Sequence, residues 1–343
     1  MTATSDGTAS RPVMADVARL AGVSHQTVSR VLNGHPNVSP ATKAAVLAAI
    51  QDLGYRPNVA ARTLATGKTN VLGVISFDTT LYGPASMLYG IERAAHPEYF
   101  VAIASLPSFD RRPLSEAVER FLSQAVAGII VIAPDTRAAE VLSGLAADVP
   151  LVAVGCGGAA PLPSVNIDNL AGAAKATQHM LDLGHRTVYH IGGPESWRDA
   201  RDRTDGWGQT LSRAGAPEPP VARGDWSARS GYKIGRELAA DPDVTAVFCA
   251  NDAMALGFLR AAAERGRHVP RDISVIGFDD IPEAPYFLPP LTTVRQDFGA
   301  LGSRALHLLM DLIMGASQAQ PTLPIEPDLI VRSSSAPPPR GRD

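Results

Sequence analysis

Hydrophobic residues follow two different periods along this chain. Between residues 13 and 65 apolar side chains recur at helical spacing, as in Met14, Val17, Ala18 and Ala21, with no strand-like alternation. From residue 70 onward, short β-branched runs alternate with helical stretches, which is typical of βαβ units and a mainly parallel sheet. Seven runs are too many for one compact sheet with ligand access, so two α/β lobes are expected; the runs are VLGVISF, FVAIAS, GIIVIA, LVAVG, TVYHIG, VTAVFCA and ISVIGF.

Three short helices are expected in the N-terminal part. The first ends before Gly22, where a tight turn needs a residue that tolerates positive φ. Ser24 can cap a second helix, which buries Val28 on its apolar side. A third helix is expected to begin at the cap-and-proline pair of residues 39–40 and to stop at Gly54. This order of helix, tight turn and helix predicts a helix-turn-helix.

The exposed face of the second helix carries hydrogen-bonding side chains only. Arg30 can pair with the two acceptors of guanine, and Gln26 can pair with adenine, so this face suits the major groove of DNA. A three-helix bundle with an ordinary solvated face fits the spacing equally well.

Charge is distributed unevenly along the chain. The whole protein has a net charge of −3, but residues 1–65 hold six basic against three acidic residues, which gives +3 and leaves −6 for the rest. A basic head on an acidic body fits an N-terminal nucleic-acid module. The polar N-terminus has no apolar signal segment, and no apolar run approaches the roughly 20 residues that span a bilayer, so a cytoplasmic protein without membrane contact is expected.

Cysteine and histidine spacing gives no sign of a metal or a cofactor. Cys156 and Cys249 each lie in an apolar run, and two cysteines make neither a zinc motif nor a disulfide framework. His179, His185 and His190 are spaced across a helix end and a strand, so they do not share one face. No phosphate-binding glycine loop or nucleophile elbow occurs, and an enzyme is not expected.

A longer run of residues resembles a known family. The string AGVSHQTVSRVLN, within residues 14–67, is similar nearly residue for residue to the headpiece of the lac repressor family, and the resemblance continues through GDWSARSGY, ANDAMALG, ISVIGFDD and PPLTTVRQDF to about residue 332. The resemblance implies that His25, Gln26 and Arg30 reach base edges. It also implies contacts to phosphates, or a role in fixing register, for Ser24, Thr27, Ser29 and Asn33. His25 stands where the family's namesake has tyrosine, so the operator need not be the same.

The segment NVAARTLA, residues 58–65, resembles the family's hinge helix. In the family this helix forms only on the operator, and its leucine, here Leu64, enters a minor-groove step and kinks the duplex. The DNA contacts implied here therefore begin at Asn58. A helix of about eight residues is too short to be stable alone, which agrees with folding on binding.

The family's body is similar to periplasmic sugar-binding proteins, with two α/β lobes and a cleft between them. The resemblance places lobe one at about 70–167 plus 296–325, and lobe two at about 168–295 plus a last strand near 326–333. Vicinal hydroxyls of a sugar need planar hydrogen-bonding groups and an aromatic face, gathered at the carboxyl ends of the strands. The residues implied for this role are Arg201, Asn251 and Asp279 as hydrogen-bonding groups, Trp226 as the packing face, Gln296 and Phe298 at the crossover, and Leu81 from lobe one.

The sequence also departs from the family pattern in lobe one. Gly155 stands where the namesake has an aspartate that reaches the sugar, so one carboxylate contact is missing. The sugar could therefore be a galactoside, a glucoside or another disaccharide. Asp252 and Asp280 are expected to be structural.

The expected fold is an all-α helix-turn-helix headpiece joined to an α/β two-lobed effector domain like a periplasmic binding protein. Residues 1–12 form a disordered arm, 13–57 the headpiece, 58–69 the hinge and linker, 70–333 the ligand-binding and dimerisation domain, and 334–343 a disordered tail. The resemblance implies a homodimeric repressor that binds a pseudo-palindromic operator and is released by a sugar. The tail has no leucine heptads, so tetramers are not expected. A purine-type corepressor response, a sugar carrier without regulation and a sugar-active enzyme are the alternatives.

Overall fold

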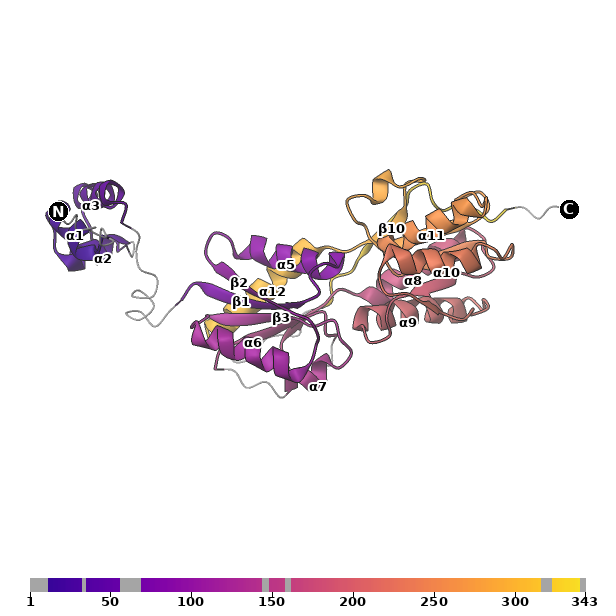
Figure 1. Cartoon of the computed structure of the whole chain (residues 1–343), viewed down its shortest axis with the longest axis horizontal. Coiled ribbons are helices and arrows are strands. Elements are labelled where there is room, and N and C mark those ends of the chain that lie inside the picture. The colour runs from indigo at the N-terminus through magenta and orange to yellow at the C-terminus, as the bar shows by residue number, and fades with distance from the viewer. Residues whose placement is uncertain are drawn as a thin grey trace, which may run out of the picture. The chain divides into compact units, whose positions relative to one another are not determined.

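The chain folds as two units that divide between Thr69 and Asn70. The computed structural model describes residues 12–32, 35–55, 69–143, 148–157, 162–315 and 323–339 (Figure 1). In these ranges no helix has both the length and the apolar character that crossing a membrane requires.

The N-terminal unit is a bundle of three helices around a small apolar core. Its core centres on Val17, Val28 and Val46, one from each helix, and all three are fully buried. The helices are α1 (Met14–Leu20), α2 (His25–Leu32) and α3 (Pro40–Leu53).

The helix boundaries follow the local chemistry that the sequence predicts. Gly22 has φ +66° in the turn between α1 and α2, and Gly54 has φ +61° after α3. The Ser24 hydroxyl accepts a hydrogen bond from the backbone N–H of Thr27 at 3.1 Å. Ser39 accepts one in the same way from Thr42 at 3.2 Å.

Lobe one of the second unit is a five-stranded parallel sheet with helices on both faces. The strand order is β2-β1-β3-β4-β5, which places β2 at one edge. Figure 1 shows α5 and α12 over one face and α6 and α7 over the other. The bounds are β1 Val71–Phe77, α5 Tyr82–Ala95, β2 Phe100–Leu106, α6 Arg111–Ser123, β3 Gly128–Ile132, α7 Ala138–Ser143, β4 Leu151–Val154, β5 Ser164–Val165 and α12 Phe298–Ile313.

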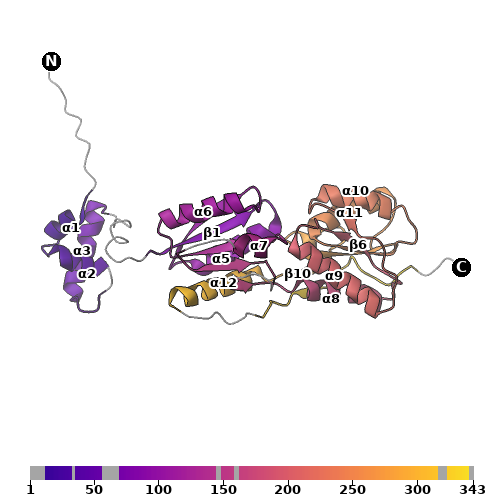
Figure 2. The same cartoon turned by 90° about the horizontal axis from the view of Figure 1, so that it is seen from below.

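Lobe two is a six-stranded sheet in the order β11-β10-β9-β8-β6-β7, with β11 antiparallel to its neighbour. The helices α8 and α9 cover one face, and α10 and α11 cover the other (Figures 1 and 2). The bounds are α8 Asn169–Asp182, β6 Tyr189–Gly192, α9 Arg198–Arg213, β7 Ala222–Arg223, α10 Ala228–Leu238, β8 Ala246–Cys249, α11 Asp252–Glu264, β9 Ser274–Asp279, the 3-10 helix η1 Ala284–Tyr286, β10 Thr292–Arg295 and β11 Asp328–Ile330.

The chain crosses between the lobes three times, after β5, after β10 and before β11. Two of these crossings pair with each other, because the N–H of Ile325 donates to the carbonyl of Asn166 at 2.8 Å and the N–H of Asp168 donates to the carbonyl of Ile325 at 2.8 Å. The α12 helix, which follows β10 in sequence, belongs to lobe one. This is the arrangement expected from the sequence.

A separate backbone contact joins the lobes at the turn before α9. The N–H of Thr136 in lobe one donates to the carbonyl of Ser196 at 2.9 Å, and the N–H of Arg198 donates back to Pro134 at 2.7 Å. These bonds hold the first residues of α9 against the loop that follows β3.

All seven apolar runs form strands, and four further strands have no such run. The strand β10 lies between β11 and β9 in the lobe-two sheet and carries buried Thr292 and Thr293, so its polar composition gives no apolar run. The strands β5 and β7 have two residues each, too few to show a period. A last strand was expected near 326–333, and β11 lies within that range.

The prediction that residues 334–343 are disordered is wrong for the first of them. Ser334 is fully buried, its hydroxyl donates to the carbonyl of Val275 at 2.6 Å, and the N–H of Val275 donates to the carbonyl of Ser334 at 2.8 Å. The N–H of Ala336 donates to the Ser274 hydroxyl at 3.0 Å. Specific hydrogen bonds to the first two residues of β9 therefore order a segment whose Ser/Pro composition predicts disorder. Residues 1–11 and 340–343 lie outside the described ranges.

Candidate functional site

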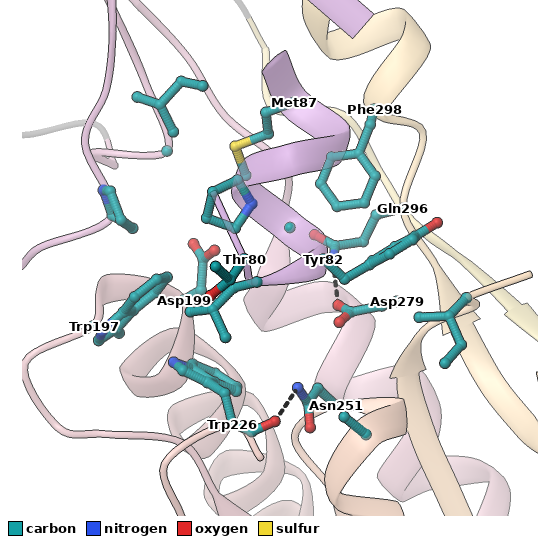
Figure 3. A pocket seen from close by; sticks show the side chains of 18 of the residues that line it. Thr80, Tyr82, Met87, Trp197, Asp199, Trp226, Asn251, Asp279, Gln296 and Phe298 are labelled. Carbon is teal, nitrogen blue, oxygen red and sulfur yellow. Dashed lines mark hydrogen bonds between the residues drawn. The ribbon is translucent and has the colours of Figure 1, made fainter. Parts of the chain in front are cut away.

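A cavity of about 340 Å³ lies between the two lobes. Its walls come from the carboxyl ends of parallel strands, where loops of α/β sheets commonly form ligand sites. This volume falls in the range of about 300–1,000 Å³ that is usual for small-molecule pockets. Figure 3 shows the labelled side chains directed into it, among them Met87 and Phe298 from lobe one and Trp226, Asn251 and Asp279 from lobe two.

A chain of hydrogen bonds forms the floor of the cavity. Asn169 donates from Nδ2 to Asp199 Oδ1 at 3.1 Å and accepts at Oδ1 from Arg203 Nε at 2.8 Å. The Arg203 guanidinium also reaches Asp279 Oδ1, at 3.4 Å, and Gln296 Nε2 donates to the same oxygen at 2.6 Å. One cation therefore lies between two carboxylates, in a network in which every member is at least nine-tenths buried.

Both carboxyl groups are harder to ionise here than in water. Burial raises the pKa of Asp279 to about 6, against the opposing effect of the Arg203 charge. Burial raises the pKa of Asp199 to about 6 in the same way, again partly offset by Arg203. Hydroxyl groups that donate to these oxygens would favour the charged forms.

Two indole rings form an aromatic wall beside this floor. The rings of Trp197 and Trp226 lie 5.6 Å apart between centroids and are inclined at 71°. Arg203 lies over the ring of Phe278, with 3.8 Å from its Cζ to the centroid, and is thereby fixed from below.

Two buried polar atoms of the cavity lining have no hydrogen-bond partner among the described residues. They are Nε1 of Trp226, a donor, and Oε1 of Gln296, an acceptor. An unpaired buried polar group costs about 1–3 kcal/mol, so a ligand that supplies one acceptor and one donor gains from both.

Backbone strain also concentrates at the cavity. Trp226 has φ +71° and Asp279 has φ +109°, both in the left-handed region that side chains avoid. Such strain persists where the surrounding structure enforces it, and it gathers at functional sites.

Six of the seven ligand-binding residues expected from sequence line the cavity: Leu81, Trp226, Asn251, Asp279, Gln296 and Phe298. Asn251 also caps α11, because its Oδ1 accepts from the N–H of Met254 at 2.9 Å and its Nδ2 donates to the carbonyl of Trp226 at 3.0 Å. The lining position and the capping role are therefore combined in one side chain.

The assignment of Arg201 to the cavity is wrong. Its side chain is exposed, and its Nε donates to the carbonyl of Glu195 at 2.8 Å. The cavity arginine is Arg203, two positions later and on the other side of α9. Helical spacing could have found it, because Arg203 falls in the buried stripe of Ala200, Trp207 and Leu211.

Three further residues of the site, at the starts of α9 and α8, are not predicted from the sequence. Trp197 and Asp199 line the cavity, and Asn169 links Asp199 to Arg203. The signal for Asp199 was its place four residues before Arg203, on the same buried face. Nothing local in the sequence marks Asn169.

Lobe one contributes a mostly apolar roof. Gly155, expected as a missing carboxylate contact, lines the cavity without a side chain. The hydroxyls on this side belong to Thr80 and Tyr82, and burial raises the pKa of Tyr82. The roof is otherwise built of apolar residues, including Leu81, Pro84, Met87, Ile132, Pro134, Val154 and Phe298.

The other conspicuous polar residues have structural partners. Asp252 accepts from Thr293 and from the N–H of Ile281, and burial raises its pKa well above the usual value. Asp280 forms ion pairs at 2.6 Å with both Arg295 and Arg332.

The three histidines bind separate partners. His179 contacts the Ser335 hydroxyl at 3.0 Å, and His185 contacts Thr245 and Ser274. His190 contacts the carbonyl of Phe248 at 2.9 Å, and burial lowers its pKa to about 3. Across the described ranges, no group of three or more histidine, cysteine or acidic side chains is arranged to hold a metal ion.

The first unit presents a separate polar surface on α2. His25, Gln26 and Arg30 are exposed, while Val28 and Val31 on the other side of the helix are buried. Thr27 and Ser29 are half-buried, and the hydroxyls of Ser24 and Thr27 lie 2.9 Å apart. The remaining expected DNA contacts, Asn33, Asn58 and Leu64, lie outside the described residues.

Comparison with known proteins identifies both units. Residues 13–58 match the description "Bacterial regulatory proteins, lacI family", and residues 177–335 match "Periplasmic binding protein-like domain". The lactose operon repressor of Escherichia coli (strain K12) is 35% identical over 90% of this chain and 87% of its own length. The HTH-type transcriptional regulator CelR of Thermobifida fusca is 35% identical over 94% of this chain and 98% of its own.

Solved structures give the same result. The lac repressor dimer bound to operator and the anti-inducer ONPF has a TM-score of 0.87 and 33% identity, covering 95% of this chain and all of that one. The complex of CelR with cellobiose has a TM-score of 0.70 and 33% identity, and the match again covers 95% of this chain and all of that one. By their names, these two relatives are a repressor and a transcriptional regulator.

Proposed function

Because the chain belongs to the lacI family of bacterial regulatory proteins, we propose that it is a transcriptional repressor whose hold on operator DNA is released by a sugar. It would act in the cytoplasm, where the chromosome is accessible. The observation that carries the proposal is the cavity lining, where Trp226 Nε1 and Gln296 Oε1 have no hydrogen-bond partner among the described residues and lie beside a charged network.

The chemistry of the cavity favours a polyol as the effector. A pyranose ring offers alternating donors and acceptors at its edge and C–H groups on its faces. The floor supplies a guanidinium, an amide and two carboxylates, and Trp226 supplies a flat apolar face. The indoles are inclined at 71° rather than parallel, so they form no slot for a planar purine. Galactosides, glucosides and other disaccharide-like sugars remain in the class.

DNA binding is assigned to the exposed face of α2. Arg30 and Gln26 have the planar donors and acceptors that read guanine and adenine in the major groove, and His25 is available beside them. A single headpiece offers little contact area, so two copies on a pseudo-palindrome are expected.

A second copy of this chain is the proposed occupant of two exposed apolar patches on the second unit. The lobe-one patch consists of Tyr89 on α5 and Phe100 and Ile103 on the edge strand β2. The lobe-two patch comprises Leu256, Tyr286 and Leu288. Large exposed apolar side chains commonly mark protein contacts, and a two-fold operator requires a two-fold protein.

The proposed route between the two sites is the segment 58–65. It follows the headpiece in sequence and precedes β1 of lobe one, and it lies outside the described residues. We propose that effector binding between the lobes favours an arrangement of the dimer in which this segment loses its helix and its minor-groove contact through Leu64.

A binding assay with the full-length protein tests the proposal. An operator is first selected from random duplex DNA, and its affinity is measured by fluorescence anisotropy with cellobiose, lactose or hypoxanthine. We expect a sugar to weaken operator binding at least fivefold and hypoxanthine to have no effect. Tightening by hypoxanthine would instead indicate a corepressor-driven protein, and failure to select any DNA would overturn the repressor assignment.

A further inference from the structure

Two consecutive residues at the cavity wall have left-handed backbone conformations. Asp279, the last residue of β9, has φ +109°, and Asp280, which follows it, has φ +51°. Side chains rarely adopt this region, so the surrounding structure must hold the chain there. The conformation directs Asp279 into the cavity, where Gln296 donates to it (Figure 3). Residues 279–281 are called the Asp279 turn below.

One buried carboxyl group holds the far end of the Asp279 turn. Oδ2 of Asp252 accepts from the backbone N–H of Ile281, the residue after Asp280, at 2.9 Å. Oδ1 of Asp252 contacts the Thr293 hydroxyl of β10 at 2.6 Å. Asp252 is fully buried and does not itself line the cavity, whereas Ile281 and the neighbouring Asn251 do. It therefore reaches the turn from behind the cavity wall.

Space for this carboxyl group is left by Gly277 of β9. A Cβ built on Gly277 would overlap Oδ1 of Asp252, so a larger residue would displace the carboxyl group. Gly277 lies beside Thr293 in the sheet register, so the same strand pair that makes the room also supplies one of the two partners. The close approach restricts where the carboxyl group of Asp252 can lie.

The two ends of the turn are held in different ways. The side chain of Asp280 forms ion pairs at 2.6 Å with Arg295 and Arg332. Asp252 instead binds the backbone, at the N–H of Ile281. A bond to a backbone N–H restrains the orientation of its peptide plane, and with it the backbone conformation of the residue before it. Asp252 is thus the group that acts on the backbone of the turn.

From these contacts we infer that Asp252 is a positioning residue for effector binding: its bond to Ile281 holds the Asp279 turn in its left-handed conformation and keeps the Asp279 carboxylate directed into the cavity. Without this bond the turn relaxes to ordinary φ values and Asp279 points elsewhere. The inference rests on the proposed sugar response and adds a residue that acts on effector affinity without touching the effector.

Calorimetry on the full-length protein tests this role. Glucose, galactose, cellobiose and lactose are titrated into the wild type, and the sugar that binds most tightly is titrated into the variants. Asp252→Ala should weaken its binding by about tenfold or more, because a misdirected Asp279 no longer makes a charged hydrogen bond to the sugar. In an Asp279→Asn background the same change should weaken binding by less than about threefold, since that charged bond is already absent.

Two further variants separate positioning from general stability. Thr293→Val removes one partner of Asp252 and keeps the bond to Ile281, so it should lower the melting temperature and leave sugar affinity within about threefold. Asp252→Asn should also keep its affinity, because burial favours the neutral acid and an amide offers the same oxygen to Ile281 and an N–H to Thr293. Asp252→Ser, whose side chain is too short to reach Ile281, replaces Asp252→Ala if melting shows that the alanine variant is unfolded.

Hydrogen exchange in the sugar-free wild type follows the Ile281 amide directly, and we expect it to exchange at least about 100-fold more slowly than in an unfolded chain. An unprotected Ile281 amide, or equal sugar affinity in wild type and Asp252→Ala, would overturn the inference but leave the sugar response standing. Equal weakening by Thr293→Val and Asp252→Ala, or an undiminished loss in the Asp279→Asn background, would also overturn it. Failure of all four sugars to bind the wild type would overturn the proposed sugar response together with this inference.

Discussion

At the scale of single residues, the cavity floor is held together by Arg203. Its Nε and Nη1 contact Asn169 and Asp279, its plane lies on Phe278, and Nη1 also donates to the carbonyl of Ala250. A planar guanidinium makes these directional contacts simultaneously, whereas an ammonium cannot. With Asp199 and Asp279 both ionised the network carries one negative charge more than it can pair, so it is built to receive hydrogen-bond donors.

The first prediction separates the two arginines of α9. Arg203→Lys should weaken effector binding about 10- to 100-fold, because the effector loses a charged hydrogen bond of about 1.5–3 kcal/mol and the floor loses its plane. The matched control, Arg201→Lys, changes an exposed side chain and should leave affinity within twofold. Calorimetric titration with the inducing sugar measures both. The reverse ranking would return Arg201 to the site.

The second prediction concerns stability and pH. Burial raises the pKa of Asp199 to about 6 from its usual 3.8, so the folded state favours the protonated acid. This contribution to stability is fully present below pH 3.8 and is lost as the pH rises through 6. Without effector, Asp199→Asn should therefore be stabilised relative to wild type at pH 8 by on the order of 2 kcal/mol, and by less at pH 5.

Urea unfolding of wild type and variant at both pH values measures this difference. His190, whose pKa is lowered to about 3 by burial, costs stability as the pH falls below 6.5, but it does so equally in both proteins and cancels. Asp205→Asn serves as the exposed control. An Asp199→Asn advantage that does not grow between pH 5 and pH 8 would contradict the raised pKa.

At the scale of elements, the spacing of apolar residues predicts most of the helices and strands, because burial of one face of each element imposes that spacing. The strands β3 and β4 are buried along their whole length and consist of apolar residues, so they were visible as runs. The strand β10 was not visible as a run, since its buried threonines are satisfied by hydrogen bonds such as Thr293 to Asp252. Long-range bonds of this kind, like those of Ser334, leave no local pattern.

The residues of the candidate site that could be predicted are those that lie at the ends of strands. Asn251 and Asp279 follow apolar runs directly, and both line the cavity. Arg203 and Asp199 lie within α9, where a displacement of two positions moves a side chain to another face of the helix. The resemblance alone implies Arg201, whereas the buried stripe of α9 selects Arg203. Asn169 acts from α8, and only the fold brings it to α9.

The third prediction belongs to α2. Arg30→Ala should reduce the difference in binding free energy between operator and random DNA by about 1–3 kcal/mol. The reason is that a side chain that reads a base discriminates between sequences. Arg19→Ala, an exposed arginine on α1, is the control and should leave the ratio unchanged. Anisotropy with both DNAs at one salt concentration gives the ratio. An unchanged ratio in Arg30→Ala would reduce Arg30 to a phosphate contact.

At the scale of the whole molecule, the proposed function requires two copies of the chain. An effector held between the lobes can alter DNA binding only if it prefers one arrangement of the dimer over another. The exposed apolar patches on both lobes are the surfaces through which such an arrangement would be set.

The fourth prediction tests the dimer. Phe100→Glu places a charge in the lobe-one patch and should convert the dimer to monomer at micromolar concentration, with operator affinity falling at least tenfold. Met314→Glu, at an exposed position after α12, is the control and should remain dimeric. Sedimentation velocity determines the mass. A dimeric Phe100→Glu protein would remove this patch from the interface.

In the proposed repressor, effector and operator binding oppose each other through one coupling free energy. Such couplings are typically about 1–3 kcal/mol, or 5- to 150-fold, and they are reciprocal. The direct test is titration of the inducing sugar into the full-length protein, free and saturated with operator. Weaker sugar binding is expected on the operator, by the same factor by which the sugar weakens operator binding. Equal affinities in the two titrations, or tighter sugar binding on the operator, would contradict it.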